Sequence, residues 1–314
     1  MTTPPDYAKI IDAETWTFIR ETESGYPPET ATFSIARQRA VYDAMCRVFH
    51  RGYPAGIAAR NDTLGGVGVR IYEVGAAAAT VVYFHGGGFV VGGLDSHDDV
   101  CADICAATGY RVISADYRLA PEHRHPAHFD DAMAATRAVA KTFGGPLVLA
   151  GDSVGATLAA AVAHATRGAG LGIIGQMLIY PGLGGDRRSG SYVIHAHAPM
   201  LTAADVEFYA GTRFGGGIEP ASDPTAAPLH DSDFAGLPPT LIHAAECDPL
   251  CDDGAAYAAA ITKAGGRARN TIEPGMVHGY LRARSLVARA RDSFARITAG
   301  ISALGQGRWP DSAA

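Results

Sequence analysis

Short apolar runs alternate along the chain with stretches in which apolar residues recur at helical spacing. Most runs lack the strict alternation of half-buried strands, and this pattern is typical of strands buried on both faces of a parallel sheet. The predicted strands cover residues 69–74, 80–84, 110–115, 147–150, 176–180, 240–245 and 269–273. Because helical segments separate them, the pattern predicts an α/β fold with a mostly parallel sheet.

The segments between the runs contain the residues that begin and end helices. One helix is expected to begin with Ser96 as its N-cap and to end at Gly109. Another is expected to begin with Asp252 or Asp253 as its cap and to end at Gly265. These signals support the alternation of strands with helices.

Two regions interrupt this alternation. Residues 1–50 contain a helical pattern before any strand, and residues 181–235 are rich in glycine and proline around one predicted helix at 203–214. The expected apolar face of the first region consists of Val41, Met45, Val48 and Phe49. Surface decoration and a lid over the strand ends are the alternatives, and we favour the lid because open α/β sheets bind ligands there. The predicted organisation is an N-terminal cap segment at 1–50 and an α/β domain at 51–314 with a cap insertion at about 181–235.

The composition indicates a globular protein that acts on a small molecule. The net charge is −6, and opposite charges are interspersed without a basic stripe or an acidic tail, so we expect neither nucleic acid nor a membrane surface as a partner. The N-terminus has no apolar core of signal-peptide length, and no later run is long enough to span a membrane. We therefore expect a cytoplasmic protein.

The cysteines and the clustered histidines do not predict a metal site. Cys101 and Cys105, like Cys247 and Cys251, are separated by three residues rather than two, which favours reduced thiols over zinc. Two histidine-rich stretches lack the i, i+4 spacing with a carboxylate, and their histidines are interpreted as solvated loop residues. These are His123, His125, His128, His195 and His197. No metal and no cofactor are expected.

One apolar run, LVLAGDSVGATLAAAVAHA, is interrupted by a serine between two glycines. GDSVG matches G-x-S-x-G, a strand-to-helix turn so tight that flanking side chains would collide, so Gly151 and Gly155 make the turn possible. The turn exposes Ser153 at the carboxyl edge of the sheet, with the amides of the following helix directed at negative charge beside it. Asp152 is grouped with the two glycines as support for this turn. A plain glycine turn is the alternative, and the position between a strand and a helix favours a nucleophile.

A serine hydroxyl needs a base, and the base needs a carboxylate that fixes its tautomer. In this kind of turn the chain order is serine, acid, histidine. His278, in GMVHGY after the last predicted strand, is the candidate base. His243 lies inside a predicted buried strand and is interpreted as a core histidine.

The candidate acid is Asp248, which comes just past the end of a predicted strand and directly before a proline. The two aspartates that follow fall where a helix needs its cap, and Glu246 is still at the strand edge. The sequence therefore predicts a catalytic triad of Ser153, Asp248 and His278.

A glycine-rich loop, YFHGGGFVVGG, follows another predicted strand. Its successive glycines leave backbone N–H groups free to approach a substrate oxygen, and Gly87 and Gly88 are the expected oxyanion donors, joined by Val154. His85 and Gly86 are expected to support the loop. We interpret His85 as a residue that shapes the loop through hydrogen bonds rather than as a catalytic group.

Together these motifs resemble the hormone-sensitive lipase family of α/β hydrolases, the bacterial esterases with an HGGG motif. The motifs are HGGGF, DYRLAPE, HPAHFDDA, GDSVG, YPGL, DPL and HG, in family order between about residues 70 and 280. The resemblance implies a cofactor-free serine hydrolase of short-acyl carboxylic esters, small molecules that bind beneath a cap built from the N-terminal region and a mid-chain insertion. It also implies that DYRLAPE is architectural, and it suggests a homodimer through an exposed edge strand.

The chain departs from the family pattern at two places. GDSVGA replaces the usual GDSAGG, so Val154 combines an oxyanion donor with a bulkier side chain and Ala156 takes the place of a glycine. Cys247 and Cys251 flank the predicted acid, which predicts activity that is sensitive to thiol reagents.

Two other functions stay open from the sequence. An amidase or peptidase uses the same triad, since its histidine has only to protonate a poorer leaving group. A non-catalytic small-ligand receptor on the same fold is the second alternative, since some relatives in this superfamily are receptors that have lost the catalytic histidine. The presence of His278 argues against it.

Overall fold

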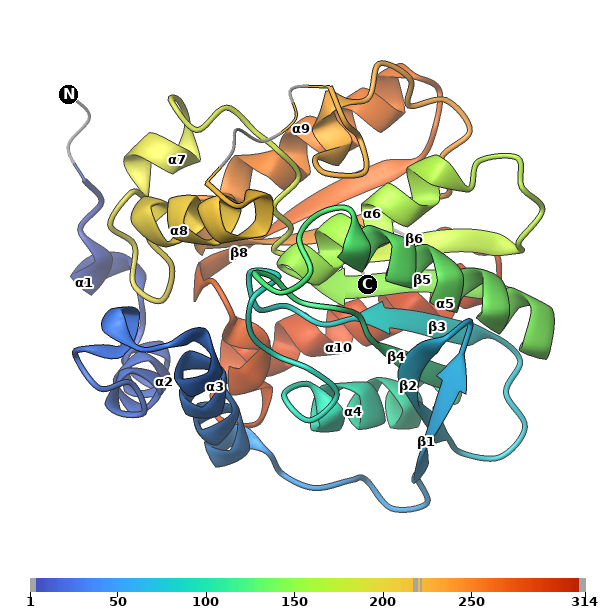
Figure 1. Cartoon of the computed structure of the whole chain (residues 1–314), viewed down its shortest axis with the longest axis horizontal. Helices are drawn as coiled ribbons and strands as arrows, with labels where there is room; N and C mark the ends of the chain where they lie inside the picture. The colour runs from blue at the N-terminus through green and yellow to red at the C-terminus, as the bar shows by residue number, and fades with distance from the viewer. Residues whose placement is uncertain (1–3, 217–219, 221, 311–314) are drawn as a thin grey trace.

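A computed structural model describes residues 4–216, 220 and 222–310, and its centre is an eight-stranded sheet (Figure 1). The strand order is β1-β2-β4-β3-β5-β6-β7-β8, with β2 antiparallel to both of its neighbours and all other pairs parallel. The strands are β1 (Ala58–Leu64), β2 (Val67–Glu73), β3 (Thr80–Phe84), β4 (Arg111–Asp116), β5 (Leu147–Asp152), β6 (Ile173–Ile179), β7 (Thr240–Cys247) and β8 (Ala268–Val277). The prediction of an α/β fold with a mostly parallel sheet is confirmed.

Strand β1 is absent from the sequence prediction. Its side chains are polar and mostly exposed at the edge of the sheet, so it lacks the apolar run that identified the other strands. It is held by backbone pairing to β2 through a hairpin whose turn, Gly65 and Gly66, has φ values of +62° and +82°. Two successive residues with positive φ favour glycine. The Gly-Gly pair is therefore the feature of the sequence from which this hairpin could be predicted.

Helices cover both faces of the sheet. One face is packed by α4 (Asp98–Thr108) and α10 (Ala288–Gly305), and the other by α5 (Ala127–Phe143), α6 (Val154–Ala165) and α9 (Cys251–Lys263). The two buried cores that result are dominated by fully buried aliphatic side chains. The buried sheet is a rigid base from which loops at the carboxyl ends of the strands can be positioned.

Two predicted helix caps are wrong. Ser96 does not cap α4, because His97 is the capping residue and the Ser96 hydroxyl bonds to Gly93 and to the His97 ring. Asp252 and Asp253 lie within the first turn of α9. The carbonyl of Asp248 accepts from the N–H of Cys251 at 3.1 Å, so this helix begins earlier than the acidic pair suggests.

The N-terminal segment and the middle insertion gather at one side of the sheet, where β3 points (Figure 1). The N-terminal elements are α1 (Tyr7–Ile10), α2 (Ala13–Ser24), η1 (Thr30–Thr32) and α3 (Ile35–Phe49). The insertion contains α7 (Ser191–Ile194), α8 (Ala203–Phe214) and η2 (Pro228–His230). Residues 1–3, 217–219, 221 and 311–314 of the predicted segments lie outside the described residues.

Helix α3 packs into the core through a different face from the predicted one. The buried side chains are Tyr42, Met45, Cys46 and Phe49, whereas Val48 is half exposed. Arg39 fixes the helix to the loops around the site, since it donates to the carbonyls of Val90 and Ala120 and pairs with Glu122 at 2.7 Å. Glu122 belongs to DYRLAPE, so the expected architectural role of that motif is confirmed.

Candidate active site

Ser153 lies at the sharp turn between β5 and α6, with φ +54° and ψ −124°. A side chain on Gly151 would meet the backbone of Gly155 at 2.5 Å, and one on Gly155 would meet the carbonyl oxygen of Phe84 at 2.0 Å. The two glycines are therefore required for the close approach of the turn to β3, as the motif predicts. The turn directs Ser153 into a cavity above the sheet edge.

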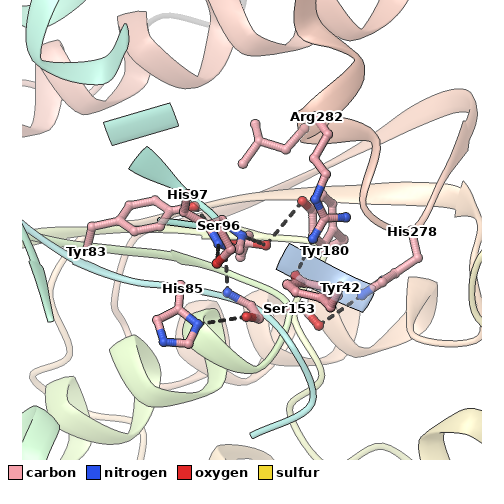
Figure 2. A network of polar contacts seen from close by, with 12 residues as sticks. Tyr42, Tyr83, His85, Ser96, His97, Ser153, Tyr180, His278 and Arg282 are labelled. Carbon is pink, nitrogen blue, oxygen red and sulfur yellow. Dashed lines mark hydrogen bonds and ion pairs between the residues drawn. The ribbon is translucent and has the colours of Figure 1, made fainter. Parts of the chain in front are cut away.

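Three residues from separate loops form a hydrogen-bonded chain. Nε2 of His278 lies 2.9 Å from Oγ of Ser153, and both residues are labelled in Figure 2. Nδ1 of His278 lies 2.6 Å from Oδ2 of Asp248. Asp248 is fully buried, and its other carboxylate oxygen accepts from the N–H of Leu250 at 2.9 Å. The structure thus brings together Ser153, Asp248 and His278 in the order that a serine nucleophile, its base and the orienting acid require.

The competing acids and the competing histidine are occupied elsewhere. His243 is buried, with Nδ1 2.7 Å from Glu273, so its interpretation as a core histidine is confirmed. Glu246 accepts from the N–H of Gly275 at 2.7 Å, which links β7 to the last residues of β8. Asp252 accepts from the N–H of Ser191 in the insertion at 2.8 Å. None of these groups is hydrogen-bonded to Ser153 or His278 in the described part of the chain.

The glycine-rich loop lies beside the serine turn. Gly87 has φ +127° and Gly88 has φ +64°, and added side chains would collide with Val91 and with the Tyr209 ring. Within the described ranges, no hydrogen bond of the backbone uses the N–H of Gly87, Gly88 or Val154. These three amides, two from the glycine-rich loop and one from the N-terminus of α6, are available to a ligand beside Ser153.

Asp152 joins the glycine-rich loop to the serine turn. Its Oδ1 accepts from the N–H of Gly86 at 3.0 Å and from the Tyr83 hydroxyl at 2.7 Å. Its Oδ2 lies 3.2 Å from Nε2 of His97 and 3.3 Å from the Tyr180 hydroxyl. Burial alone would raise the pKa of Asp152, but His97 and these hydrogen bonds hold it well below its usual range. Asp152 is therefore an anion that fixes the loop.

His85 supports the same loop from the other side. Its Nδ1 lies 2.8 Å from the carbonyl oxygen of Gly86, and its ring stacks on Tyr117 at 4.3 Å between centroids. Burial lowers the pKa of His85 to about 4, so the ring is neutral near pH 7. It has no hydrogen bond to Ser153 in the described structure, and its contacts fit the loop-shaping role that the sequence predicts.

The cavity that contains Ser153 has a volume of about 640 Å³, which suits a small organic molecule. Its walls come from the serine turn, from the N-terminal segment and from the insertion, including Tyr26, Met45, Met200, Val206 and Tyr209. Both segments that interrupt the alternation of strands and helices thus contribute to the cavity over the carboxyl ends of the strands.

The interpretation of the clustered histidines as solvated is wrong for two of them. His128 is fully buried, because its ring packs against Phe89 and its Nε2 accepts from Nε of Arg213 at 3.0 Å. His125 lies 3.0 Å from Asp223 through Nε2 and is largely enclosed. These contacts join α5 to the insertion, and only the three-dimensional structure brings them together.

None of the five cysteines has an exposed thiol. All five are free and buried, and among the described residues no group of His, Cys, Asp and Glu could hold a metal ion. Burial, with nearby carboxylates, raises the pKa of both Cys247 and Cys251 to about 12. Buried thiols that stay protonated react slowly, so the burial of both cysteines argues against the predicted sensitivity to thiol reagents.

A parallel sheet with a serine turn, a following acid and a late histidine defines the α/β-hydrolase class. A family model described as alpha/beta hydrolase fold matches residues 81–282, and the chain belongs to this family. The resemblance to the hormone-sensitive lipase group is confirmed by its relatives. Carboxylesterase NlhH of Mycobacterium tuberculosis is 38% identical over 257 residues, 77% of this chain and 79% of the relative.

Other relatives agree in sequence and in fold. The ethyl acetate hydrolase of Pseudomonas putida is 34% identical over 243 residues, 73% of this chain and 76% of the relative. The hyperthermophilic esterase of Pyrobaculum calidifontis has a TM-score of 0.84 at 29% identity, and the match covers 93% of this chain and 98% of that chain.

In the described residues, no helix is both long and apolar enough to cross a membrane.

Proposed function

We propose that the protein is a serine carboxylesterase that hydrolyses small carboxylic esters through Ser153, His278 and Asp248. The observation that supports this most strongly is the hydrogen-bonded chain from Ser153 Oγ through His278 to Asp248, at 2.9 Å and 2.6 Å, on the wall of the cavity. Relatives named as carboxylesterases and an ethyl acetate hydrolase match most of the chain and support the same reaction.

In the proposed acylation step, His278 Nε2 removes the proton from Ser153 Oγ as the oxygen attacks the ester carbonyl. Asp248 holds Nδ1 of the ring in its protonated tautomer and stabilises the imidazolium that forms. The proton then passes from Nε2 to the leaving alcohol, and the acyl group remains on Ser153. Water, activated by the same nitrogen, releases the acid and restores the serine.

The negative charge on the carbonyl oxygen develops beside free backbone donors. The amides of Gly87, Gly88 and Val154 are proposed to bind this oxyanion, and each donor of this kind typically supports a factor of about 10² to 10³ in rate. Asp152 and His85 act indirectly, because they fix the loop that presents the glycine amides.

We propose that residues 1–50 and about 181–235 form a cap over this site. The cap would favour substrates with short acyl chains. The proposal is supported by the cavity walls, which both segments line. A cap that excludes water strengthens the electrostatic contacts at the reacting carbonyl.

A panel of p-nitrophenyl esters from acetyl to palmitoyl tests the proposed activity. We expect the highest kcat/KM on the short esters, and we expect Ser153→Ala to lose about 10⁴-fold or more in rate. Ser189→Ala, at an exposed position, is the matched control. Activity of Ser153→Ala within tenfold of the parent would reject the assignment.

A cytoplasmic location and a homodimer are further proposals. The location is supported by the five unpaired cysteines, which suit a reducing compartment. The dimer is supported by β8, an edge strand on which Ile272 is half exposed. Light scattering of the purified protein would test the dimer, and a monomeric mass would reject it.

A further inference from the structure

Arg282 is a positively charged group on the wall of the cavity, and it has no carboxylate partner among the described residues. It lies in η3 (Tyr280–Ser285), four residues after His278, and lines the same cavity as Ser153. In the described chain, no carboxylate oxygen lies within 4.0 Å of its guanidinium nitrogens. Arg284, two residues further on, differs in this respect, since it pairs with Asp99 and Asp103 at 2.7 Å each.

The contacts of Arg282 are with neutral groups. Its Nη2 donates to the Tyr42 hydroxyl, and its guanidinium lies 5.0 Å from the Tyr42 ring centre (Figure 2). Its Nε is buried and has no hydrogen-bond partner within the described ranges. Tyr180, Tyr26 and Cys46 are the other close neighbours. Burial raises the pKa of each of these phenols and of the thiol, so none of them is an anion near pH 7.

One carboxylate, Asp152, feels the charge of Arg282 but does not bind it. The field of Arg282 helps to hold the pKa of Asp152 low. The four hydrogen-bond partners of that carboxylate are nevertheless Gly86, Tyr83, His97 and Tyr180. Arg282 therefore keeps nitrogen donors that are hydrogen-bonded to no anion from the part of the chain that the structure describes.

An enclosed cation without a directly bonded counter-charge is costly to the fold, and an anion entering from the cavity would offset that cost. A guanidinium binds a carboxylate in a planar, two-point geometry that few other groups match. Tyr26 and Tyr209 line the same cavity. Their hydroxyls have no hydrogen-bond partner among the described residues, so they are two further donors for a ligand. The donors on this wall thus match an anion with several acceptor oxygens.

We propose that Arg282, assisted by the tyrosine hydroxyls around it, binds a carboxylate of the substrate, so that the preferred substrates are esters that bear a second, ionised carboxylate. This inference rests on the proposed esterase function. The anion-binding site lies next to the triad, since a Cβ added to Gly279 would meet Nη1 of Arg282 at 3.1 Å. The two functional groups of the substrate are therefore separated by a short carbon chain.

Matched ester pairs test the proposal in the full-length enzyme. On the acyl side of the ester, monoethyl glutarate is compared with ethyl pentanoate. On the alcohol side, the acetate ester of ω-hydroxypentanoate is compared with pentyl acetate. Hydrolysis is followed by titration of the released acid. In each pair a carboxylate replaces a methyl group. We expect kcat/KM of the parent enzyme to favour the anionic ester by about tenfold or more on either the acyl or the alcohol side. One charge-assisted hydrogen bond between Arg282 and the carboxylate would produce a preference of this size.

Arg282→Gln should reverse this ratio in favour of the neutral ester, because the carboxylate would then lose its solvation without compensation. Arg282→Lys should keep part of the preference, and Arg187→Gln, which removes an exposed cation from the same cavity, should retain it. The ratio is independent of the amount of active enzyme, so partial unfolding of a variant does not change it.

Each other outcome is decisive. A parent that hydrolyses the neutral esters equally well or better on both sides overturns the anion-binding site and leaves the esterase intact. Loss of the preference in Arg187→Gln but not in Arg282→Gln also overturns it. If the parent hydrolyses none of the four esters and none of the p-nitrophenyl esters, the proposed esterase function itself is rejected.

Discussion

Nδ1 of His278 lies 2.6 Å from Oδ2 of Asp248 although thirty residues separate them in the chain. The contact follows from the topology, because β7 and β8 are parallel neighbours and each residue follows the carboxyl end of its strand. Parallel pairing brings those two ends to the same edge of the sheet, where the serine turn that follows β5 also lies.

Asp248→Asn should lower kcat by roughly 10³ to 10⁴, because an amide at this position favours the wrong tautomer of the imidazole. Asp252→Asn is the matched control, since Asp252 is exposed and bonds only to the insertion. Steady-state kinetics on p-nitrophenyl acetate measures both. If Asp252→Asn were the more damaging change, the acid would be misassigned.

Val154→Ala should broaden the range of accepted esters. The Val154 side chain is partly exposed and lines the cavity, while its N–H is a proposed oxyanion donor that the substitution keeps. A pocket discriminates one methylene by about 1–3 kcal/mol, so we expect the optimum acyl length to rise while acetyl-ester rates change less than tenfold. An unchanged profile across the ester panel would assign the selectivity to the cap.

Asp253 predicts a specific pH dependence of stability. Burial raises its pKa to about 6, since the N–H groups of Leu183 and Gly185 and the Tyr192 hydroxyl offset that burial only in part. Because the folded-state pKa is raised above the unfolded value, the stabilisation is complete below about pH 4 and is lost as the pH rises through about 6.

Asp253→Asn removes this titration. Relative to the parent, the free energy of unfolding of the variant should therefore increase by roughly 2 to 3 kcal/mol between pH 4 and pH 7. Urea unfolding at a series of pH values measures the difference, with Asp252→Asn as control. Parent and variant curves that run parallel over this range would contradict the raised pKa.

Arg39→Met should loosen the N-terminal segment from the loops of the active site. Arg39 donates to Val90 and Ala120 and pairs with Glu122, and hydrogen bonds from a charged donor are each worth about 1.5–3 kcal/mol. We expect roughly tenfold lower kcat/KM and faster proteolysis near residue 30, because the cap no longer closes the cavity. Arg37→Met, on the exposed face of the same helix, is the control, and equal behaviour of the two variants would show that α3 is not held through Arg39.

The sheet and the three triad candidates were predictable because their signals are local. Continuous apolar runs identify strands buried on both faces, and the steric demand of the serine turn requires glycines at two fixed positions. The rule of chain order then leaves few choices for the acid and the base. The strand β1 was missed because a polar edge strand is specified by backbone pairing rather than by an apolar pattern.

Other features depend on residues that only the fold brings together. His97 and Asp152 are 55 positions apart, and no spacing in the sequence connects them. Their contact also explains the wrong cap at Ser96, whose hydroxyl is used to orient the His97 ring at 2.8 Å. The missing partner of Arg282 is likewise a property of the surrounding cavity and has no signature in its neighbours along the chain.

Ser153 is assigned as the nucleophile, and the site of covalent labelling tests this assignment most directly. The purified protein would be treated with a fluorophosphonate, digested and analysed by mass spectrometry, with His278→Ala treated in parallel. We expect one equivalent of label on the peptide that contains Ser153, and strongly reduced labelling in His278→Ala because the serine then lacks its base. Label on another residue, or an unlabelled Ser153 in the folded parent, would contradict the assignment.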